Sequence, residues 1–237
     1  MVEIRAGIEL PAIREEISFV TSDCLTLVGE LALPVHNSPV ATLITFHPLP
    51  THGGFMDSHI IRKMANRLPA LADLAVIRFN TRGTSSPRGT SEGSFGDGIT
   101  ERADLEAALA FAASRGLPNL WLVGWSFGTE LVLKYGHDKS VLGGILMSPP
   151  LHRTSRDELL VWADNGKQLI AIIPEFDDYL QPTEASTRFS VIPQLELVAV
   201  AGGKHLWVGE NATKTVLNEI VRVVNPQKYP LPETTEI

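Results

Sequence analysis

The chain has almost no sulfur available for cross-linking or metal binding. Cys24 is the only cysteine among 237 residues, which excludes an internal disulfide and a cysteine-rich metal site. The sequence also lacks an HExxH motif and an acidic run with the spacing of a calcium loop. No GxGxxG follows an apolar strand, and the glycines of residues 83–98 lack the Gly-Lys-Ser/Thr end of a phosphate-binding loop. We therefore expect no metal and no nucleotide cofactor.

Positive charge is also in short supply. Lysine and arginine total 20 against 27 aspartate and glutamate residues, giving a net charge of −7. No basic cluster stands out, so a nucleic-acid backbone or an anionic lipid surface would find no electrostatic partner. We expect a small molecule as the partner, and neither nucleic acid nor membrane.

Long apolar runs are missing as well. The longest uncharged stretch, residues 31–55, is interrupted by four prolines and by Gly53-Gly54, so it cannot form one membrane-spanning helix. The first twenty residues carry six charged side chains, which is incompatible with the continuous apolar segment of a secretory signal. The sequence therefore predicts a cytoplasmic location.

The composition is that of a folded globular chain. Hydrophobic residues make up 44% and charged residues 20% of the sequence, and this length can bury a large core. We expect a single α/β domain over residues 1–237. From about residue 226 the chain contains three prolines and little periodicity, which predicts a loose surface tail.

The hydrophobic pattern predicts alternating strands and helices. Leucines alternate with other residues from Leu25 to Leu33, and together with residues 16–20 they predict an antiparallel hairpin. Alternating βα units then favour a mainly parallel sheet, whose catalytic groups should follow the carboxyl ends of strands. Predicted strands cover residues 40–46, 74–79, 120–123, 141–147, 168–173 and 196–200, and helices cover 58–71, 105–112, 127–135, 156–163, 182–189 and 211–224.

One sequence motif predicts a catalytic residue. Residues 124–128, Gly-Trp-Ser-Phe-Gly, match G-x-S-x-G between an apolar strand and a helix. In this setting a sharp turn lifts the hydroxyl of Ser126 above the sheet, which predicts a nucleophile. The backbone N–H of Phe127, at the start of the helix, is then a donor for an oxyanion. The competing interpretation is a glycine-rich turn kept for packing alone.

Together with this motif, two further segments give the chain a family resemblance. Residues 47–54 form a His-Pro-x-Pro segment followed by Gly-Gly, and residues 78–83 form an Arg-Phe-Asn…Arg-Gly stretch. The chain resembles the α/β-hydrolase superfamily over nearly its whole length, and more narrowly a group of small hydrolases related to dienelactone hydrolase-like enzymes. The resemblance implies a mainly parallel, twisted sheet of about eight strands with helices on both faces.

The superfamily order of catalytic residues along the chain is Ser, acid, His. It points to His205, in a Gly-Gly-Lys-His segment after a predicted strand, as the general base. The alternative is an ordinary surface histidine. The acid should follow residues 168–173: the pattern of the resembling group, with Tyr179 as its aromatic residue, favours Asp177. Counting back from Pro182 favours Asp178 instead.

A second oxyanion donor should come from the loop after the strand of residues 40–46. Two prolines in that loop have no N–H, so the N–H of Leu49 is the remaining candidate, as the resemblance also implies. Of the flanking histidines, we expect His47 to bond loop backbone and leave His52 open between loop and substrate. Arg82 begins a long loop and could bind an anionic substrate, although tying loops together is the commoner role. Two tryptophans next to predicted site residues, Trp125 and Trp207, are expected to be wall and core.

The resemblance implies a serine hydrolase acting on a carboxylic ester, lactone or thioester. Peptidase or acyltransferase chemistry would use the same residues, and a non-catalytic binding protein on this fold is a further alternative. Only about twenty residues, 148–167, separate two predicted strands where many α/β-hydrolases insert a cap. We therefore expect no large cap, and an open site walled by residues 148–156 and 82–98.

Overall fold

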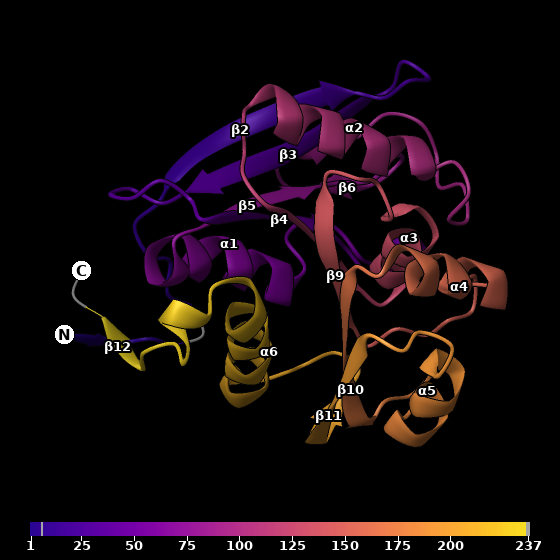
Figure 1. Ribbon diagram of the computed structural model, residues 1–237. Helices are drawn as coiled ribbons and strands as arrows, with labels where there is room; N and C mark the ends of the chain where they lie inside the picture. The colour runs from indigo at the N-terminus through magenta and orange to yellow at the C-terminus, as the bar shows by residue number, and fades with distance from the viewer. Residues whose placement is uncertain (6, 236–237) are drawn as a thin grey trace.

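The computed structural model describes residues 1–5 and 7–235, and an eight-stranded sheet runs through it (Figure 1). The strand order is β11-β10-β9-β8-β4-β5-β3-β2. All neighbours from β5 to β11 pair in parallel, whereas β2 and β3 form the predicted antiparallel hairpin at one edge. The strands are β2 (Ile13–Val20), β3 (Thr26–Leu33), β4 (Ala41–Phe46), β5 (Leu74–Phe79), β8 (Leu120–Trp125), β9 (Val141–Met147), β10 (Gln168–Phe176) and β11 (Leu195–Lys204).

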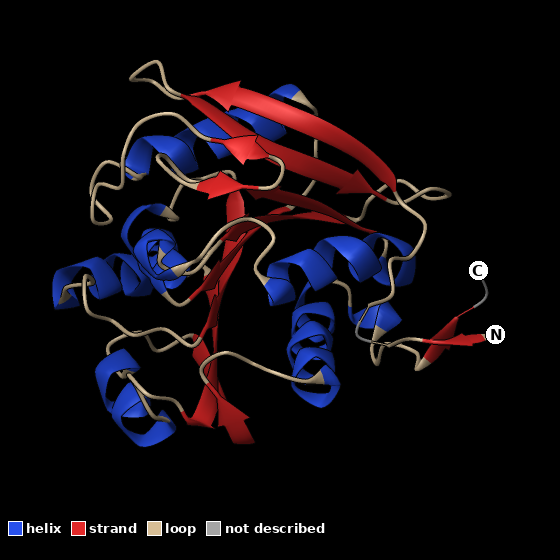
Figure 2. Ribbon diagram, turned by 180° about the vertical axis from the view of Figure 1, so that it is seen from behind, coloured by secondary structure: helices blue, strands red, loops and turns tan. Residues whose placement is uncertain are grey.

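Helices cover both faces of the sheet, as parallel βα units require. Figures 1 and 2 show α1 and α6 on one side and α3, α4 and α5 on the other. The buried side chains of α2 belong to the same hydrophobic cluster as those of α3. The helices are α1 (His59–Ala72), α2 (Arg102–Ser114), α3 (Phe127–Tyr135), α4 (Arg156–Asn165), α5 (Pro182–Phe189) and α6 (Glu210–Val224).

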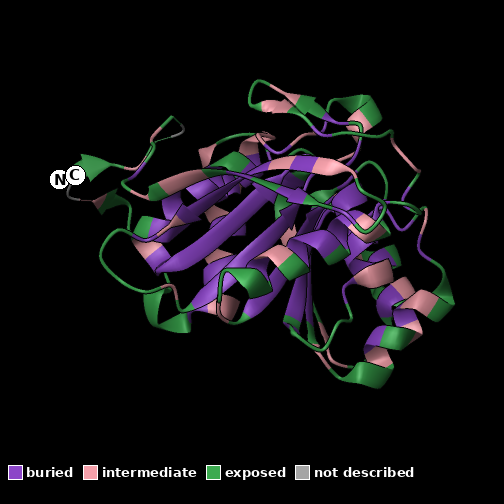
Figure 3. Ribbon diagram, turned by 90° about the horizontal axis from the view of Figure 1, so that it is seen from above, coloured by how far each residue is buried: buried purple, intermediate pink, exposed green. Residues whose placement is uncertain are grey.

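The central strands are completely buried, as Figure 3 shows by colour. Every residue of β4, β5 and β8 lies in the core. These strands are short apolar runs, because with helices on both faces neither side of the strand meets water. In α6 the buried positions are spaced by three and four residues, so that one stripe faces the sheet.

The C-terminal segment differs from the loose tail that the sequence predicted. Strand β12 (Thr234–Thr235) pairs antiparallel with β1 (Val2–Glu3), so the described ends of the chain lie side by side (Figures 1 and 2). Leu231 is buried, and its backbone N–H donates to the Asn218 side chain over 2.8 Å. Leu231 holds the segment against α6, and β1, which is distant in sequence, pairs with the end of the segment. Within the described residues, no helix is both long and apolar enough to span a bilayer.

Ion pairs of Arg82 attach the loop that begins at this residue to the rest of the protein. The Arg82 guanidinium donates to Asp104 on α2 over 2.9 Å and to Asp23 in the β2–β3 turn over 2.9 Å. Burial opposes the charge of Arg82, but the hydrogen bonds that it donates to both carboxylates raise its pKa above the usual value. Arg82 therefore ties loops together and does not face a substrate. A two-residue ladder, β6 (Ser85–Ser86) with β7 (Gly89–Thr90), shapes the rest of the loop.

Candidate active site

Ser126 occupies the sharp turn between β8 and α3. Its backbone lies at φ 52° and ψ −119°, a region that costs a non-glycine residue about 1–3 kcal/mol. The flanking glycines are required by space. A Cβ on Gly124 would lie 2.5 Å from the backbone of Gly128, and one on Gly128 would lie 2.1 Å from the carbonyl oxygen of Phe46. The strained turn therefore exists only because both neighbours lack side chains.

The structure brings Ser126, His205 and Asp177 together. The Oγ of Ser126 lies 3.0 Å from Nε2 of His205, and Nδ1 of the same ring lies 2.9 Å from Oδ2 of Asp177. These residues directly follow strands β8, β11 and β10, so the parallel sheet gathers them at one edge although they are far apart in sequence. In this order the imidazole can take the proton of the hydroxyl, and the carboxylate orients the imidazole and stabilises the imidazolium that forms.

Asp177, and not Asp178, is the carboxylate that faces the imidazole. Burial opposes the charge of Asp177, but hydrogen bonds from His205 and from backbone N–H groups hold its pKa below the usual value. Those backbone donors are Tyr179 at 2.9 Å and Leu180 at 3.2 Å, both to Oδ1. Asp178 is exposed to solvent. The carboxylate beside His205 is therefore held ionised and in a fixed orientation.

The backbone of His205 is fixed from two sides. The indole N–H of Trp125 and the hydroxyl of Ser148 both donate to its carbonyl oxygen, each over 3.2 Å. Trp125 and Trp207 are both buried, in agreement with the predicted wall and core roles. The ring of Tyr179 packs edge-on against the imidazole, 4.7 Å between centroids. These contacts limit the movement of the imidazole relative to Ser126.

The loop after β4 holds the Leu49 N–H in a fixed direction. The carbonyl oxygen of Leu49 accepts hydrogen bonds from the N–H groups of His52 and Gly54, each over 3.0 Å. A Cβ on Gly54 would lie 2.0 Å from the carbonyl oxygen of Pro48, so the loop closes this tightly only with glycine there. Within the described residues, the N–H groups of Leu49 and Phe127 have no hydrogen-bond partner in the protein. Two unused donors beside Ser126 are what an oxyanion requires.

His47 supports the same loop, as the sequence predicted. The N–H of Thr81 donates to its Nε2 over 3.1 Å, so Nδ1 carries the proton and donates to the carbonyl oxygen of Pro48 over 2.7 Å. This bond orients the peptide plane that carries the Leu49 N–H. Burial lowers the pKa of His47 to about 4, because no acidic partner compensates the charged form. The ring is neutral near pH 7.

The depressed pKa of His47 predicts a specific loss of stability in acid. In the unfolded chain His47 takes up a proton near pH 6.5, whereas in the folded protein it resists protonation until about pH 4. The unfolded state therefore binds more protons in this window, and the free energy of unfolding falls as the pH drops through it. Relative to His47→Gln, which has no titratable ring, the wild type should lose about 3 kcal/mol between pH 7 and pH 4.

Urea denaturation at several pH values measures this difference, and groups that titrate in both proteins cancel in it. A constant difference between pH 7 and pH 4 would show that His47 titrates normally in the folded protein.

A cavity of about 300 Å³ opens at Ser126. The sequence predicted walls from residues 148–156 and 82–98, and the first is present. The second prediction is wrong: no residue of the loop 82–98 lines the cavity, because ion pairs of Arg82 with Asp23 and Asp104 hold that loop against the hairpin and α2. His52, left open by the sequence, is one of the lining residues. These are Pro48, Leu49, His52, Ser126, Phe127, Glu130, Pro150, His152, Arg153, Tyr179, His205 and Leu206.

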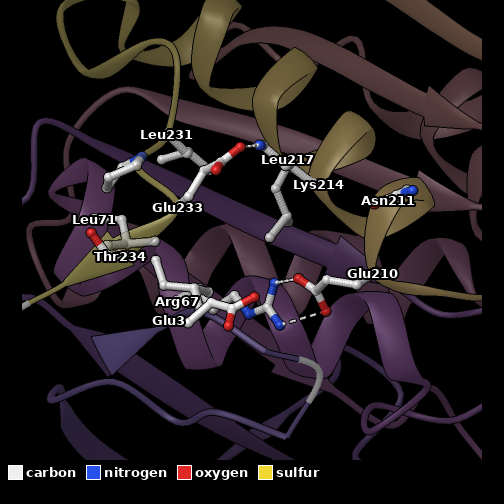
Figure 4. Close-up of a pocket in the computed structure, with 12 residues that line it drawn as sticks. Glu3, Arg67, Leu71, Glu210, Asn211, Lys214, Leu217, Leu231, Glu233 and Thr234 are labelled. Atoms are coloured by element: carbon white, nitrogen blue, oxygen red, sulfur yellow. Dashed lines mark hydrogen bonds and ion pairs between the residues drawn. The ribbon is translucent and has the colours of Figure 1, made fainter. Parts of the chain in front are cut away.

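A second cavity, of about 410 Å³, lies between α1, α6 and the paired termini, away from Ser126 (Figure 4). Four of its charged side chains pair with one another: Arg67 binds Glu210 over 2.5 and 3.0 Å, and Lys214 pairs with Glu233. Over residues 1–5 and 7–235, no cluster of three or more His, Cys, Asp and Glu side chains could hold a metal ion. The cavity at Ser126 is therefore the candidate active site.

Two charged residues of the cavity were not identified from the sequence. Glu130, on α3, is completely buried and accepts hydrogen bonds from the backbone N–H and the guanidinium of Arg153. The signal for Glu130 was an acidic residue one helical turn after the motif serine, inside an apolar helix. Arg153 lies in the loop after β9, where the strand-end rule predicts functional groups.

Comparison with known proteins identifies solved structures with a similar fold. No family model matches the chain, and a search of curated proteins found no match. An α/β serine hydrolase homologue from Coxiella burnetii is similar at TM-score 0.75 and 23% identity, over 88% of this chain and 96% of that one. A lidless α/β serine hydrolase from Xanthomonas campestris is similar at TM-score 0.74 and 25% identity, over 96% of this chain and 99% of that one. An esterase from Pyrococcus furiosus is similar at TM-score 0.70 and 18% identity, over 92% of each chain.

The narrower resemblance to dienelactone hydrolase-like enzymes rests on the sequence motifs alone. The broader one is confirmed, since strand order, helices on both faces and the solved structures agree. The chain has the α/β-hydrolase fold.

Proposed function

We propose that the protein is a serine hydrolase that cleaves a carboxylic ester, lactone or thioester through an acyl-enzyme. Ser126 is the nucleophile, His205 the general base, and Asp177 the carboxylate that orients and stabilises the imidazolium. The N–H groups of Leu49 and Phe127 form the oxyanion hole. The observation that carries the proposal is the continuous chain of contacts, 3.0 Å from Ser126 Oγ to Nε2 and 2.9 Å from Nδ1 to Asp177.

The reaction follows from these positions. Nε2 of His205 takes the proton from Ser126 as Oγ bonds to the substrate carbonyl carbon, and the carbonyl oxygen becomes an oxyanion between the two N–H groups. The imidazolium then protonates the leaving alcohol or thiol as its bond to carbon breaks. Water repeats the sequence on the acyl-enzyme and releases the acid and free Ser126. Asp177 stays ionised throughout, in keeping with its lowered pKa.

Structural neighbours that are described as serine hydrolases and an esterase support this chemistry. Peptidases and acyltransferases use the same residue set. We favour hydrolysis of an ester-like bond because a structural neighbour that covers 92% of this chain is described as an esterase. A non-catalytic role is disfavoured because the serine, histidine and carboxylate are all in contact.

The proposal is tested by active-site labelling combined with a substrate panel. A fluorophosphonate should label the folded protein at one site, which peptide mass spectrometry should locate at Ser126, while heat-denatured protein stays unlabelled. Turnover of p-nitrophenyl esters, lactones, thioesters and aminoacyl amides, with and without an added alcohol acceptor, then ranks hydrolysis against peptidase and transfer chemistry. Folded protein that neither takes up the label nor hydrolyses any member of the panel would contradict the proposal.

The oxyanion hole gives a sharper prediction. Leu49→Pro removes one N–H donor, and the backbone at Leu49, with φ −53°, already suits a proline ring. The expected result is a kcat lower by about 10²- to 10³-fold with a smaller change in KM, because the lost bond forms to the transition state. Steady-state kinetics on one activated ester measures both constants.

Leu49→Ala is the matched control, since it shortens the side chain but keeps the N–H. It should retain kcat within a few-fold. Equal losses in the two variants would mean that the Leu49 side chain matters and that its N–H does not.

A further inference from the structure

The cavity at Ser126 has two different walls, and the mechanism assigns each a part of the substrate. His205 must protonate the leaving group, so the leaving group lies on the side of the imidazole. That side is open and apolar at its rim, where Tyr179 is 53% and Leu206 56% exposed. The acyl group is then left with the remaining lining residues, among which Phe127 and Arg153 contact each other and form one wall.

Arg153 is held rigidly in that wall. Its Nε donates to Asp97 over 2.6 Å, and its Nη1 reaches Glu130 over 3.4 Å. The guanidinium carbon lies 5.5 Å from the ring centre of Phe127. Nη2 donates to no other described residue. An arginine that is fixed by three contacts and lines a cavity with unused N–H groups is a preorganised donor.

The surrounding charges determine which acceptor group on the substrate suits this donor. Glu130 is completely buried and Asp97 is 68% exposed on its side chain, and both carboxylates bind the one guanidinium. Together the three groups carry a net charge of about −1. A carboxylate on the substrate would add a third negative charge to the cluster, whereas a neutral oxygen would gain the hydrogen bond without repulsion.

On the basis of the hydrolase function proposed above, we propose that Arg153 is a substrate-binding residue that donates through Nη2 to an uncharged oxygen of the acyl group. The preferred substrates are esters of short acids that carry a second, neutral carbonyl or hydroxyl oxygen. The cavity volume of about 300 Å³ fits acyl groups of this modest size.

Three p-nitrophenyl esters with acyl chains of similar length test the proposal, because they share a leaving group. Methyl succinate offers a neutral oxygen, hexanoate offers none, and hydrogen succinate offers a carboxylate. After correction for their rates of alkaline hydrolysis, kcat/KM for methyl succinate should exceed that for hexanoate by about tenfold. Hydrogen succinate should be the poorest of the three. In Arg153→Met the ratio of methyl succinate to hexanoate should fall to about one.

Asp97→Asn provides an independent arm, because it removes the exposed carboxylate and leaves Arg153 and Glu130 in place. This variant should raise kcat/KM for hydrogen succinate several-fold relative to methyl succinate, even if Arg153→Met fails to fold. Thermal denaturation of each variant monitors folding.

Wild-type protein that hydrolyses methyl succinate and hexanoate equally well, or that prefers hydrogen succinate, would overturn the inference about Arg153. Absence of hydrolysis on all three esters, together with absence of labelling at Ser126, would instead overturn the proposed function.

Discussion

Ser126→Ala is expected to lower kcat for ester hydrolysis by about 10⁶-fold, the effect of losing the nucleophile in other serine hydrolases. Alanine has no group that can bond to the carbonyl carbon, so no acyl-enzyme forms. The residual rate should come from the oxyanion donors and substrate binding, which alone give about 10³- to 10⁴-fold over water. KM should change little, because the hydroxyl contributes to the transition state and not to ground-state binding. Stopped-flow and long-time-course assays of an activated ester cover the required range.

The fold should tolerate this change. Alanine keeps the Cβ of serine, so the backbone strain at φ 52° is the same, and among the described residues the hydroxyl hydrogen-bonds only to His205. The melting temperature of Ser126→Ala should therefore lie close to that of the wild type. A variant that stays folded and keeps more than about one hundredth of the wild-type kcat would contradict Ser126 as the nucleophile.

Asp177→Asn is expected to lower kcat by about 10⁴-fold, through the tautomer of His205. Two backbone N–H groups, from Tyr179 and Leu180, donate to Oδ1 of Asp177 and will hold the amide oxygen of the new side chain there. The amide nitrogen then takes the place of Oδ2, which lies 2.9 Å from Nδ1 of His205. Because this nitrogen donates, Nδ1 must accept, and the ring proton moves to Nε2. An Nε2 that already carries a proton cannot take the one from Ser126.

Asp178→Asn is the matched control, because it makes the same chemical change one residue along the chain. Asp178 is exposed, so its variant should keep kcat within about twofold. Comparison of kcat for the two variants, with circular dichroism as a check on folding, decides which carboxylate acts. A larger loss in Asp178→Asn than in Asp177→Asn would contradict the assignment.

Much of the fold could be predicted from the sequence because its signals are local. The apolar runs that became β4, β5 and β8 are bounded by polar, glycine and proline residues, and every residue in them is buried. The elbow was also readable, since only glycine fits on either side of Ser126. Leu49 was identified by elimination, because the neighbouring prolines have no N–H to offer.

The remaining features depend on contacts between residues far apart in the chain. Asp177 and Asp178 are chemically identical neighbours, and only the position of the loop after β11 determines which one meets His205. The loop of residues 82–98 was expected to line the cavity, but ion pairs of Arg82 with Asp23 and Asp104 hold it against the hairpin and α2.

The positions of the C-terminal segment and of Arg153 also could not be predicted from the sequence. Pro226 to Thr235 has no periodicity of its own, and it is ordered by Leu231 in a distant apolar cluster and by the strand partner near the N-terminus. Arg153 lies close to Ser126 because Glu130 on α3 and Asp97 in another loop both bind its guanidinium. The sequence by itself determined the strands, the helices and the strained turn, since these depend on neighbours in the chain. Only the tertiary structure decided which side chains meet at Ser126, because that depends on how separate loops pack at one edge of the sheet.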